Sequence, residues 1–349
     1  MKKLILYVNP KYLTKFSLSP LLFPFYGLGS KKTILFWEPV FANHGYDPKY
    51  YEVTNNIEKA DLYFIPHNYW LLTKYDPGLL DKFCYEAKEH HKQILVDAYG
   101  DNTNKINMPN AIVLRSSVYK DQLAPEDIVI PAYVEDLARE ITYRNKPRIP
   151  TIGFVGWGDI SFTRNPLTAV KVHILNLTAI LRGYHKREEN GIFLRKSALK
   201  ILENTKTINT NFILRKSYSG HVKTIELDEK TARQEFVQNI IDSDYTLCVR
   251  GSGNFSCRFY ETLSLGRIPV VLDTDMVFPL ENIINYNEFC LVINYKELEN
   301  IGRKIVDFHK SLSPEKFINM QSKAREAYEN YLRIDNFTTY LVDEIYKKL

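Results

Sequence analysis

Short runs of consecutive apolar residues recur along this chain, and stretches with helical patterning separate them. Strands buried on both faces read as continuous apolar runs, whereas half-exposed strands alternate apolar with polar residues. Strands that alternate with helices favour a parallel sheet and an α/β architecture. In the first half, the strands predicted in this way are Leu4–Val8, Asp61–Pro66, Gln93–Asp97, Ala111–Leu114 and Ile128–Ile130.

The pattern is interrupted at residues 144–150, RNKPRIP, and then starts again. Two prolines and three basic residues do not easily continue a helix or a central strand, so we predict an interdomain linker here. A helix is predicted over Leu167–Arg182, and Asp228 is a suitable N-cap for a later helix. Further strands are predicted at Thr151–Val155, Phe212–Leu214, Tyr245–Val249, Ile268–Leu272 and Leu291–Ile293.

The length of 349 residues is too great for one compact core and indicates two domains. We predict an N-terminal Rossmann-like domain at residues 1–145 and a second Rossmann-like domain at 146–320. A helical tail at 321–349 is expected to pack back on the first domain.

Composition excludes several functional classes. A net charge of +5 on an ordinary globular composition suits an anionic ligand and weak attraction to a membrane surface. It is not the dense basic stripe of a nucleic-acid-binding protein. No run approaches the ~20 apolar residues of a spanning helix, and the one after Lys3 is too short for a secretory signal. We expect a cytoplasmic protein, at most peripheral to the inner membrane face.

The segment Tyr245–Asp273 carries the clearest chemical signal. A predicted buried strand ends in a glycine-containing loop that leads into a helix, and Gly266 ends that helix before the next strand. In open α/β sheets ligands bind at the carboxyl ends of strands, where this loop lies. The free N–H groups and positive dipole end of the helix suit a phosphate.

Arg258 and Glu261 are three residues apart and share one face of this helix. An arginine fork matches phosphate oxygens, and an ionised glutamate accepts hydrogen bonds from a pair of sugar hydroxyls. Such a pair is also common on solvated helix surfaces. The glycine loop before it and the glycine–proline turn after it favour binding. The residues of this segment that we predict to bind a ligand are Arg250, Gly251, Ser252, Gly253, Asn254, Ser256, Arg258 and Glu261.

The run LCVRGSGNFSCRFYETLSLGRIPVVLDTDMVFP resembles the C-terminal signature of the exostosin family, glycosyltransferase family 47. Ala60–Pro66, Pro125–Pro131 and Ile152–Gly156 are similar to other parts of that family, more weakly. The matching signature positions are Arg250-Gly251, Ser256, Arg258, Glu261, Gly266 and Pro269-Val270-Val271.

The exostosin resemblance implies a GT-B fold, with two Rossmann-like domains facing a cleft. It also implies a nucleotide-sugar donor and an inverting, metal-independent transfer, and it carries nucleotide binding onto Arg250, Gly251, Ser256, Arg258 and Glu261. Animal exostosins have a membrane anchor and a second transferase domain. This chain looks more like the short bacterial or viral relatives, so heparan-type polymerisation is not implied.

Other segments could complete the site. Gly156 and Trp157 lie at the end of a predicted strand, where the backbone can approach a ligand closely, and Arg215 or Lys216 could reach a diphosphate. Asp273-Thr274-Asp275 resembles the DxD of metal-dependent transferases, but a capped turn is the better interpretation, so no metal or other cofactor is expected. The candidate catalytic bases all lie in the first domain: Asp101, which we favour, His67 and Asp97.

The expected partners are a nucleotide sugar, with UDP as the nucleotide, and a glycan or glycoconjugate acceptor in polysaccharide biosynthesis. Two alternatives stay open. A fucosyltransferase that uses GDP-fucose also has a helix with Glu before a Pro-Val strand, although Tyr260-Glu261-Thr262 departs from its usual Thr-Glu-Lys triplet. A non-catalytic sugar-nucleotide or glycan-binding protein would bind the donor without transfer. Nucleic-acid binding has little support.

Overall fold

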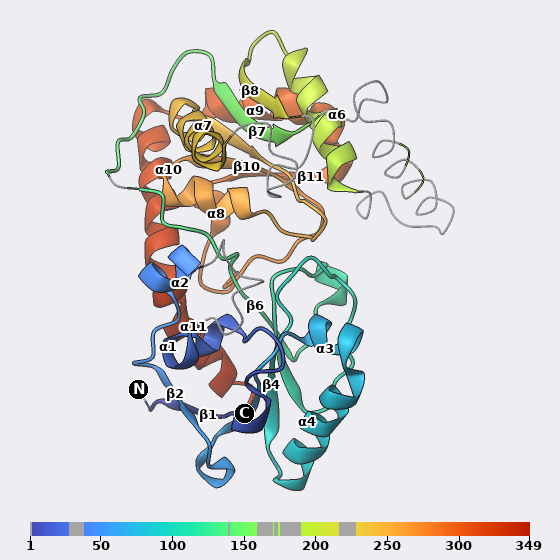
Figure 1. Ribbon diagram of the computed structural model, residues 1–349. Helices are drawn as coiled ribbons and strands as arrows, with labels where there is room; N and C mark the ends of the chain where they lie inside the picture. The colour runs from blue at the N-terminus through green and yellow to red at the C-terminus, as the bar shows by residue number, and fades with distance from the viewer. Residues whose placement is uncertain are drawn as a thin grey trace. The chain divides into compact units, whose positions relative to one another are not determined.

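The computed structural model describes residues 2–27, 38–138, 140–158, 190–215 and 228–349, together with Val170 and Ile174. It divides into two compact units (Figure 1). The first comprises Met1–Asp136, Val277–Glu281 and Tyr328–Leu349, and the second comprises Leu137–Met276 and Asn282–Ala327. Most of the predicted helix over 167–182 lies outside the described residues.

Among its described residues, the first unit contains a six-stranded parallel sheet with the order β2-β1-β3-β4-β5-β6. The edge strand β2 was not predicted, because only Tyr51 of its four residues is buried and it lacks a continuous apolar run. The strands are β1 Leu4–Tyr7, β2 Tyr51–Thr54, β3 Leu62–Ile65, β4 Gln93–Asp97, β5 Ala111–Arg115 and β6 Asp127–Val129.

The helices of the first unit begin at clear local signals. In α4, for example, the Asp76 side chain accepts from the N–H of Leu79, and Pro77 occupies the first turn, where its missing N–H is not needed. The last helix, α11, belongs to this unit, and its Thr338 hydroxyl accepts from Asp47 N at 3.0 Å. The helices are α1 Phe23–Tyr26, α2 Glu38–His44, α3 Tyr69–Tyr75, α4 Pro77–Glu89 and α11 Ile334–Tyr346.

Five parallel strands of the second unit's described residues form a sheet with the order β11-β10-β9-β7-β8. Its central strands β9 and β10 are buried along their whole length, as their apolar sequences predict. The strands are β7 Thr151–Trp157, β8 Asn209–Arg215, β9 Tyr245–Cys248, β10 Ile268–Asp273 and β11 Leu291–Asn294.

Helices cover both faces of this second sheet (Figure 1). Helices α6 and α9 pack together on one face, and α7, α8 and α10 contact the other. These elements are α6 Gly191–Glu203, α7 Glu229–Asp242, α8 Cys257–Ser264, α9 Ile301–Ser311 and α10 Pro314–Ala327. Two α/β units with parallel sheets and helices at the C-terminus confirm the predicted fold class. No helix within the described ranges combines the length and the apolar character needed to cross a bilayer.

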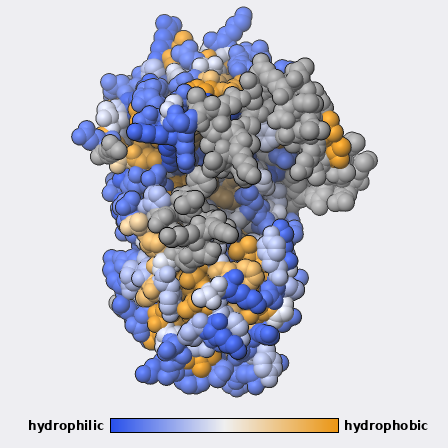
Figure 2. Space-filling model, in the orientation of Figure 1, coloured by the Kyte–Doolittle hydropathy of each residue, from blue (hydrophilic) through white to orange (hydrophobic). Residues whose placement is uncertain are grey.

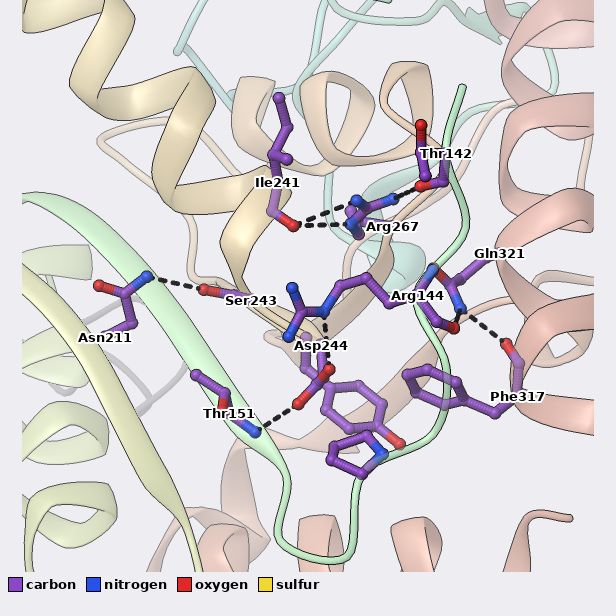
Figure 3. A network of polar contacts seen from close by, with 12 residues as sticks. Thr142, Arg144, Thr151, Asn211, Ile241, Ser243, Asp244, Arg267, Phe317 and Gln321 are labelled. Carbon is purple, nitrogen blue, oxygen red and sulfur yellow. Dashed lines mark hydrogen bonds and ion pairs between the residues drawn. The ribbon is translucent and has the colours of Figure 1, made fainter. Parts of the chain in front are cut away.

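The chain segment that enters the second unit is fixed at the amino ends of the strands (Figure 3). Arg144 Nε donates to Asp244 Oδ1 at 2.8 Å, and Asp244 Oδ2 accepts from Thr151 N at 2.8 Å. Gln321 of α10 accepts from Arg144 N and donates to Arg144 O, both at 2.9 Å. Arg267 completes this network, which we call the linker clamp: Arg144, Asp244, Arg267 and Gln321.

Arg267 is buried just before β10 and uses every nitrogen of its side chain. Nε and Nη2 donate to Ile241 O at 3.2 and 3.1 Å, and Nη1 donates to Thr142 O at 3.0 Å (Figure 3). Burial, with the positive charge of Arg144 nearby, lowers the pKa of Arg267 to about 10. We predicted an interdomain linker at residues 144–150, and Arg144 at its start is bonded to residues of the second unit.

Candidate functional site

The carboxyl ends of β7, β8, β9 and β10 lie at one edge of the second sheet, opposite the linker clamp, because all the strands are parallel. The loop after β9 leads into α8. Arg250 in this loop is buried, and its Nη1 donates to the carbonyls of Gly251 and Ser252 at 3.3 Å each, while Gly251 and Ser252 themselves are exposed. The arginine therefore shapes the loop and leaves its glycine-containing turn open to solvent.

A hydrogen bond joins the rest of this loop to a neighbouring element. The buried Asn254 accepts through Oδ1 from Thr274 Oγ1 at 2.6 Å, which joins the loop to the turn after β10. Gly253 is buried beside it. Ser256 is the N-cap residue of α8, but its side chain makes no capping hydrogen bond. The Ser256 hydroxyl thus does not act as the acceptor that a serine N-cap commonly provides.

Arg258 lies in the first turn of α8 and turns back toward the end of β7. Its Nη2 donates to Val155 O, and its guanidinium lies 4.1 Å from the centroid of the Phe154 ring. Its Nε is buried and has no hydrogen-bond partner among the described residues. Burial lowers the pKa of Arg258, while the thiol of Cys248 and the carboxylate of Glu261 act in the opposite direction.

Gly156 gives Arg258 the space that it occupies. Its φ of +145° lies in a region that favours glycine, and a Cβ there would stand 3.1 Å from Arg258 Nη2. We expected Gly156 to let a ligand approach the backbone closely. In the structure the group close to it is the arginine.

Glu261 follows one turn later and pairs with an arginine that sequence reasoning missed. Arg233 of α7 donates through Nη1 to Glu261 Oε1 at 2.6 Å. The Glu261 side chain is 12% exposed, so this carboxylate is largely desolvated beside its partner. Nothing in the sequence around Arg233 sets it apart from the other charges of α7. Only the packing of α7 beside α8 reveals its role.

A second missed arginine, Arg195, comes from α6. It donates through Nη1 to Trp157 O at 2.9 Å and through Nη2 to Arg250 O at 3.4 Å, so it joins the end of β7 to the loop after β9. The start of α6 touches the same loop, because a Cβ on Gly191 would stand 2.2 Å from Arg250 O. The close approach explains why glycine begins this helix.

Arg215, predicted from its position after a strand, forms an ion pair with Glu235 of α7 through Nη2. The Glu235 carboxylate thus offsets the positive charge of Arg215, whereas the guanidinium of Arg258 lies against an aromatic ring. Lys216, predicted with it, lies outside the described residues.

Two of the three candidate bases are held as structural groups. Asp97 is buried; its Oδ2 accepts from Ser19 Oγ at 2.7 Å and its Oδ1 from Tyr99 N at 2.8 Å, and burial raises its pKa. His67 is also buried, with Nδ1 3.2 Å from Ser17 O and Nε2 2.8 Å from a second carbonyl. Both predicted bases are thus buried and hydrogen-bonded within the first unit, whereas a base must reach the proton of the acceptor.

Asp101 is different, because its side chain is exposed while its backbone is held. Ser116 Oγ contacts both Gly100 N, at 3.0 Å, and Gly100 O, at 3.1 Å. Ser117 Oγ donates to Asp101 O at 3.3 Å. A fixed loop that presents an exposed carboxylate suits a catalytic base or an acceptor-binding group.

The segment Asp273-Thr274-Asp275, which resembles a DxD motif, leads into a turn after β10. Asp273 Oδ1 accepts from Met276 N at 2.9 Å, which is the capped turn that we expected, and Asp275 has a φ of +59°. Within the described part of the chain, no three His, Cys, Asp or Glu side chains gather as a metal site would require.

Comparisons with known proteins agree with the sequence motif. Residues 162–307 match the model of the Exostosin GT47 domain, which confirms the predicted family resemblance over this segment. An Exostosin-1 homolog of Caenorhabditis elegans is 27% identical over 118 residues, which cover 34% of this chain and 30% of that relative. The aligned region thus spans less than a third of the curated relative.

Several solved structures are similar at a low level. Anabaena Alr3699/HepE, solved with UDP and glucose, is 10% identical over 100% of both chains, with a TM-score of 0.41. A glycosyltransferase from Rickettsia africae is 14% identical over 83% of this chain and 77% of its own, with a TM-score of 0.37. TarM is 11% identical over 75% of this chain and 57% of its own, with a TM-score of 0.33.

Proposed function

We propose that this chain is an inverting, metal-independent glycosyltransferase that moves a sugar from a UDP-sugar to a hydroxyl of a glycan or glycoconjugate. The observation that carries the proposal is the arrangement around Arg258: a buried guanidinium nitrogen without a partner in the described chain, next to an α8 N-terminus without a side-chain cap. The exostosin match over the same region supports it.

In this proposal the donor's diphosphate lies at the start of α8. Guanidinium groups form strong, charge-assisted hydrogen bonds with phosphate, and a helix N-terminus adds N–H donors and a positive dipole. Charge develops on the leaving diphosphate as the glycosidic bond breaks, so donors fixed in advance stabilise the transition state more than the ground state. Arg258, Arg250 and the α8 amides would do here what a metal ion does in metal-dependent transferases.

Glu261 then recognises hydroxyl groups of the donor. Its Oε1 accepts from Arg233, and Oε2 is the oxygen through which we propose that it receives a ribose hydroxyl. Inversion is a single displacement at the anomeric carbon, in which the acceptor oxygen attacks as the diphosphate leaves and a base takes the acceptor's proton. Asp101 is the base that we propose, since its carboxylate is exposed on a fixed loop.

A donor panel tests the proposal. The purified chain would be titrated with UDP-, GDP-, ADP- and dTDP-sugars, first by thermal shift and then by calorimetry, with EDTA present throughout. We expect UDP-sugars to raise the melting temperature and to release UDP slowly even without an acceptor. Turnover with GDP-fucose alone would point to the fucosyltransferase instead, and donor binding without hydrolysis or transfer to any acceptor would point to a non-catalytic binding protein.

The proposed cellular context is polysaccharide or glycoconjugate synthesis on the cytoplasmic side of a membrane, with at most peripheral contact with the lipid. Co-sedimentation with anionic vesicles tests the membrane contact, because a mild positive charge would give binding that disappears at high salt.

A further inference from the structure

Arginine and phenylalanine side chains alternate at the carboxyl edge of the second sheet. The Arg258 guanidinium lies 4.1 Å from the ring centroid of Phe154 and 5.5 Å from that of Phe236. Arg195 lies 5.6 Å from the Phe154 centroid, and Arg233 lies 5.4 Å from the Phe236 centroid. We call these five residues the arginine–phenylalanine row: Arg195, Phe154, Arg258, Phe236 and Arg233.

The row assembles residues from four different elements. Phe154 is a buried residue of β7, whereas Phe236 is a half-buried residue of α7. Arg195 belongs to α6 and Arg258 to α8. Apart from Arg233 and Phe236, which are three residues apart on α7, no sequence spacing links them, so the row as a whole is a product of packing.

Guanidinium groups repel one another, and bringing several together requires something that offsets the repulsion. The negative face of an aromatic ring does so, because its quadrupole attracts a cation without cancelling the cation's charge. A carboxylate in the same place would neutralise the arginine, as Glu235 does for Arg215. Phenylalanine therefore holds Arg258 beside the other arginines without cancelling its charge, whereas Arg233 is paired with Glu261.

Phe236 holds a particular place in the row. Its ring contacts both Arg258, which we propose binds the diphosphate, and Arg233, which pairs with Glu261 at 2.6 Å. The two halves of the proposed donor site, one for phosphate and one for hydroxyl groups, meet at this side chain. We propose that Phe236 is a positioning residue of the donor site: it sets the guanidinium of Arg258 and, through Arg233, the carboxylate of Glu261. This inference rests on the proposed function.

The test compares Phe236→Leu with Phe236→Tyr, because leucine removes the aromatic face and tyrosine keeps it. Binding of UDP and of GDP would be measured by calorimetry, and the urea midpoint would be recorded for each protein. We expect Phe236→Leu to weaken binding of the preferred nucleotide by about fivefold to tenfold, as the loss of two cation–ring contacts would. Phe236→Tyr should bind within about twofold of the wild type.

A second variant keeps the test decisive if Phe236→Leu unfolds. Arg233→Gln removes the guanidinium that the ring holds, and we expect a similar loss of affinity at an unchanged urea midpoint. Where both single variants fold, the double variant should lose no more than about the larger single loss, because the two residues act through one arrangement.

The possible failures are distinguishable. A wild type that binds neither UDP nor GDP overturns the proposed function, and the inference with it. A wild type that binds one of them while Phe236→Leu binds equally well overturns the inference alone. Equal weakening by leucine and tyrosine would show that Phe236 merely packs α7, and full additivity with Arg233→Gln would show that the two side chains act separately.

Discussion

Arg267 at the amino edge of the second sheet and Arg258 at its carboxyl edge are satisfied in opposite ways. At the amino edge, every side-chain nitrogen of Arg267 donates to a backbone carbonyl, and Arg144 pairs with the buried Asp244. At the carboxyl edge, Arg258 has one donating nitrogen, Nη2, beside a buried Nε that lacks a partner among the described residues. Burial lowers the pKa of both Arg258 and Arg267.

The difference motivates the proposal that Arg267 is structural and that Arg258 binds a ligand. A buried polar group without a partner costs free energy, and we propose that a bound phosphate offsets this cost at Arg258. Arg267 is complete and stabilises the path of the chain into the second unit. Arg258 lies on an aromatic ring that leaves its charge in place. Each of the following predictions tests this contrast.

The largest effect is expected at the amino edge. Arg267→Met would leave the carbonyls of Thr142 and Ile241 without their buried donor, and we expect it to lower the free energy of unfolding by about 3–5 kcal/mol. Urea unfolding followed by circular dichroism measures this. A loss below about 1 kcal/mol would contradict the view that this edge is structural.

Arg258→Ala should show the reverse pattern. We expect binding of the preferred nucleotide to weaken by about 100-fold, since a charge-assisted contact with phosphate is lost. Stability should stay near that of the wild type, because the buried nitrogen without a partner is removed as well. Arg303→Ala, an exposed arginine of α9, is the matched control and should change neither property. If Arg258→Ala bound the nucleotide as tightly as the wild type, the proposal that Arg258 binds a ligand while Arg267 is structural would be contradicted.

A smaller effect is expected for Gln321→Ala. The Gln321 side chain is buried and makes two hydrogen bonds with the backbone of Arg144, so its loss should cost about 1–3 kcal/mol of stability. Gln238→Ala on the exposed side of α7 is the control and should cost much less. Nucleotide affinity, measured on the folded protein, should be unaffected, since the clamp lies at the other edge of the sheet.

The smallest effect concerns pH. His309 bridges Tyr245 OH and Pro147 O at 2.8 Å each, and burial lowers the pKa of its imidazole. The unfolded chain therefore binds the proton more readily, so this stability is present above the unfolded pKa of about 6.5 and declines as pH falls toward the folded pKa. Urea midpoints at pH 7.5 and 5.5 should differ less in His309→Gln than in the wild type. An identical pH dependence in both proteins would contradict this.

Much of the fold follows from local sequence. The apolar runs predict the buried strands β3, β4, β9 and β10, and Asp228 caps α7 as expected. The edge strand β2 escapes such a prediction, since an exposed edge does not need a continuous apolar run.

For the candidate site too, local sequence predicts one part and tertiary packing decides the other. The sequence alone determined that a strand, a glycine-containing loop and a helix bearing Arg258 and Glu261 would follow one another, because these signals lie within a few turns of chain. Only the tertiary structure decided that Arg195, Arg233 and Phe236 lie beside them, and that Asp97 and His67 are buried and engaged. Side chains far apart in sequence meet where parallel strands end together, and no local pattern encodes which of them will touch.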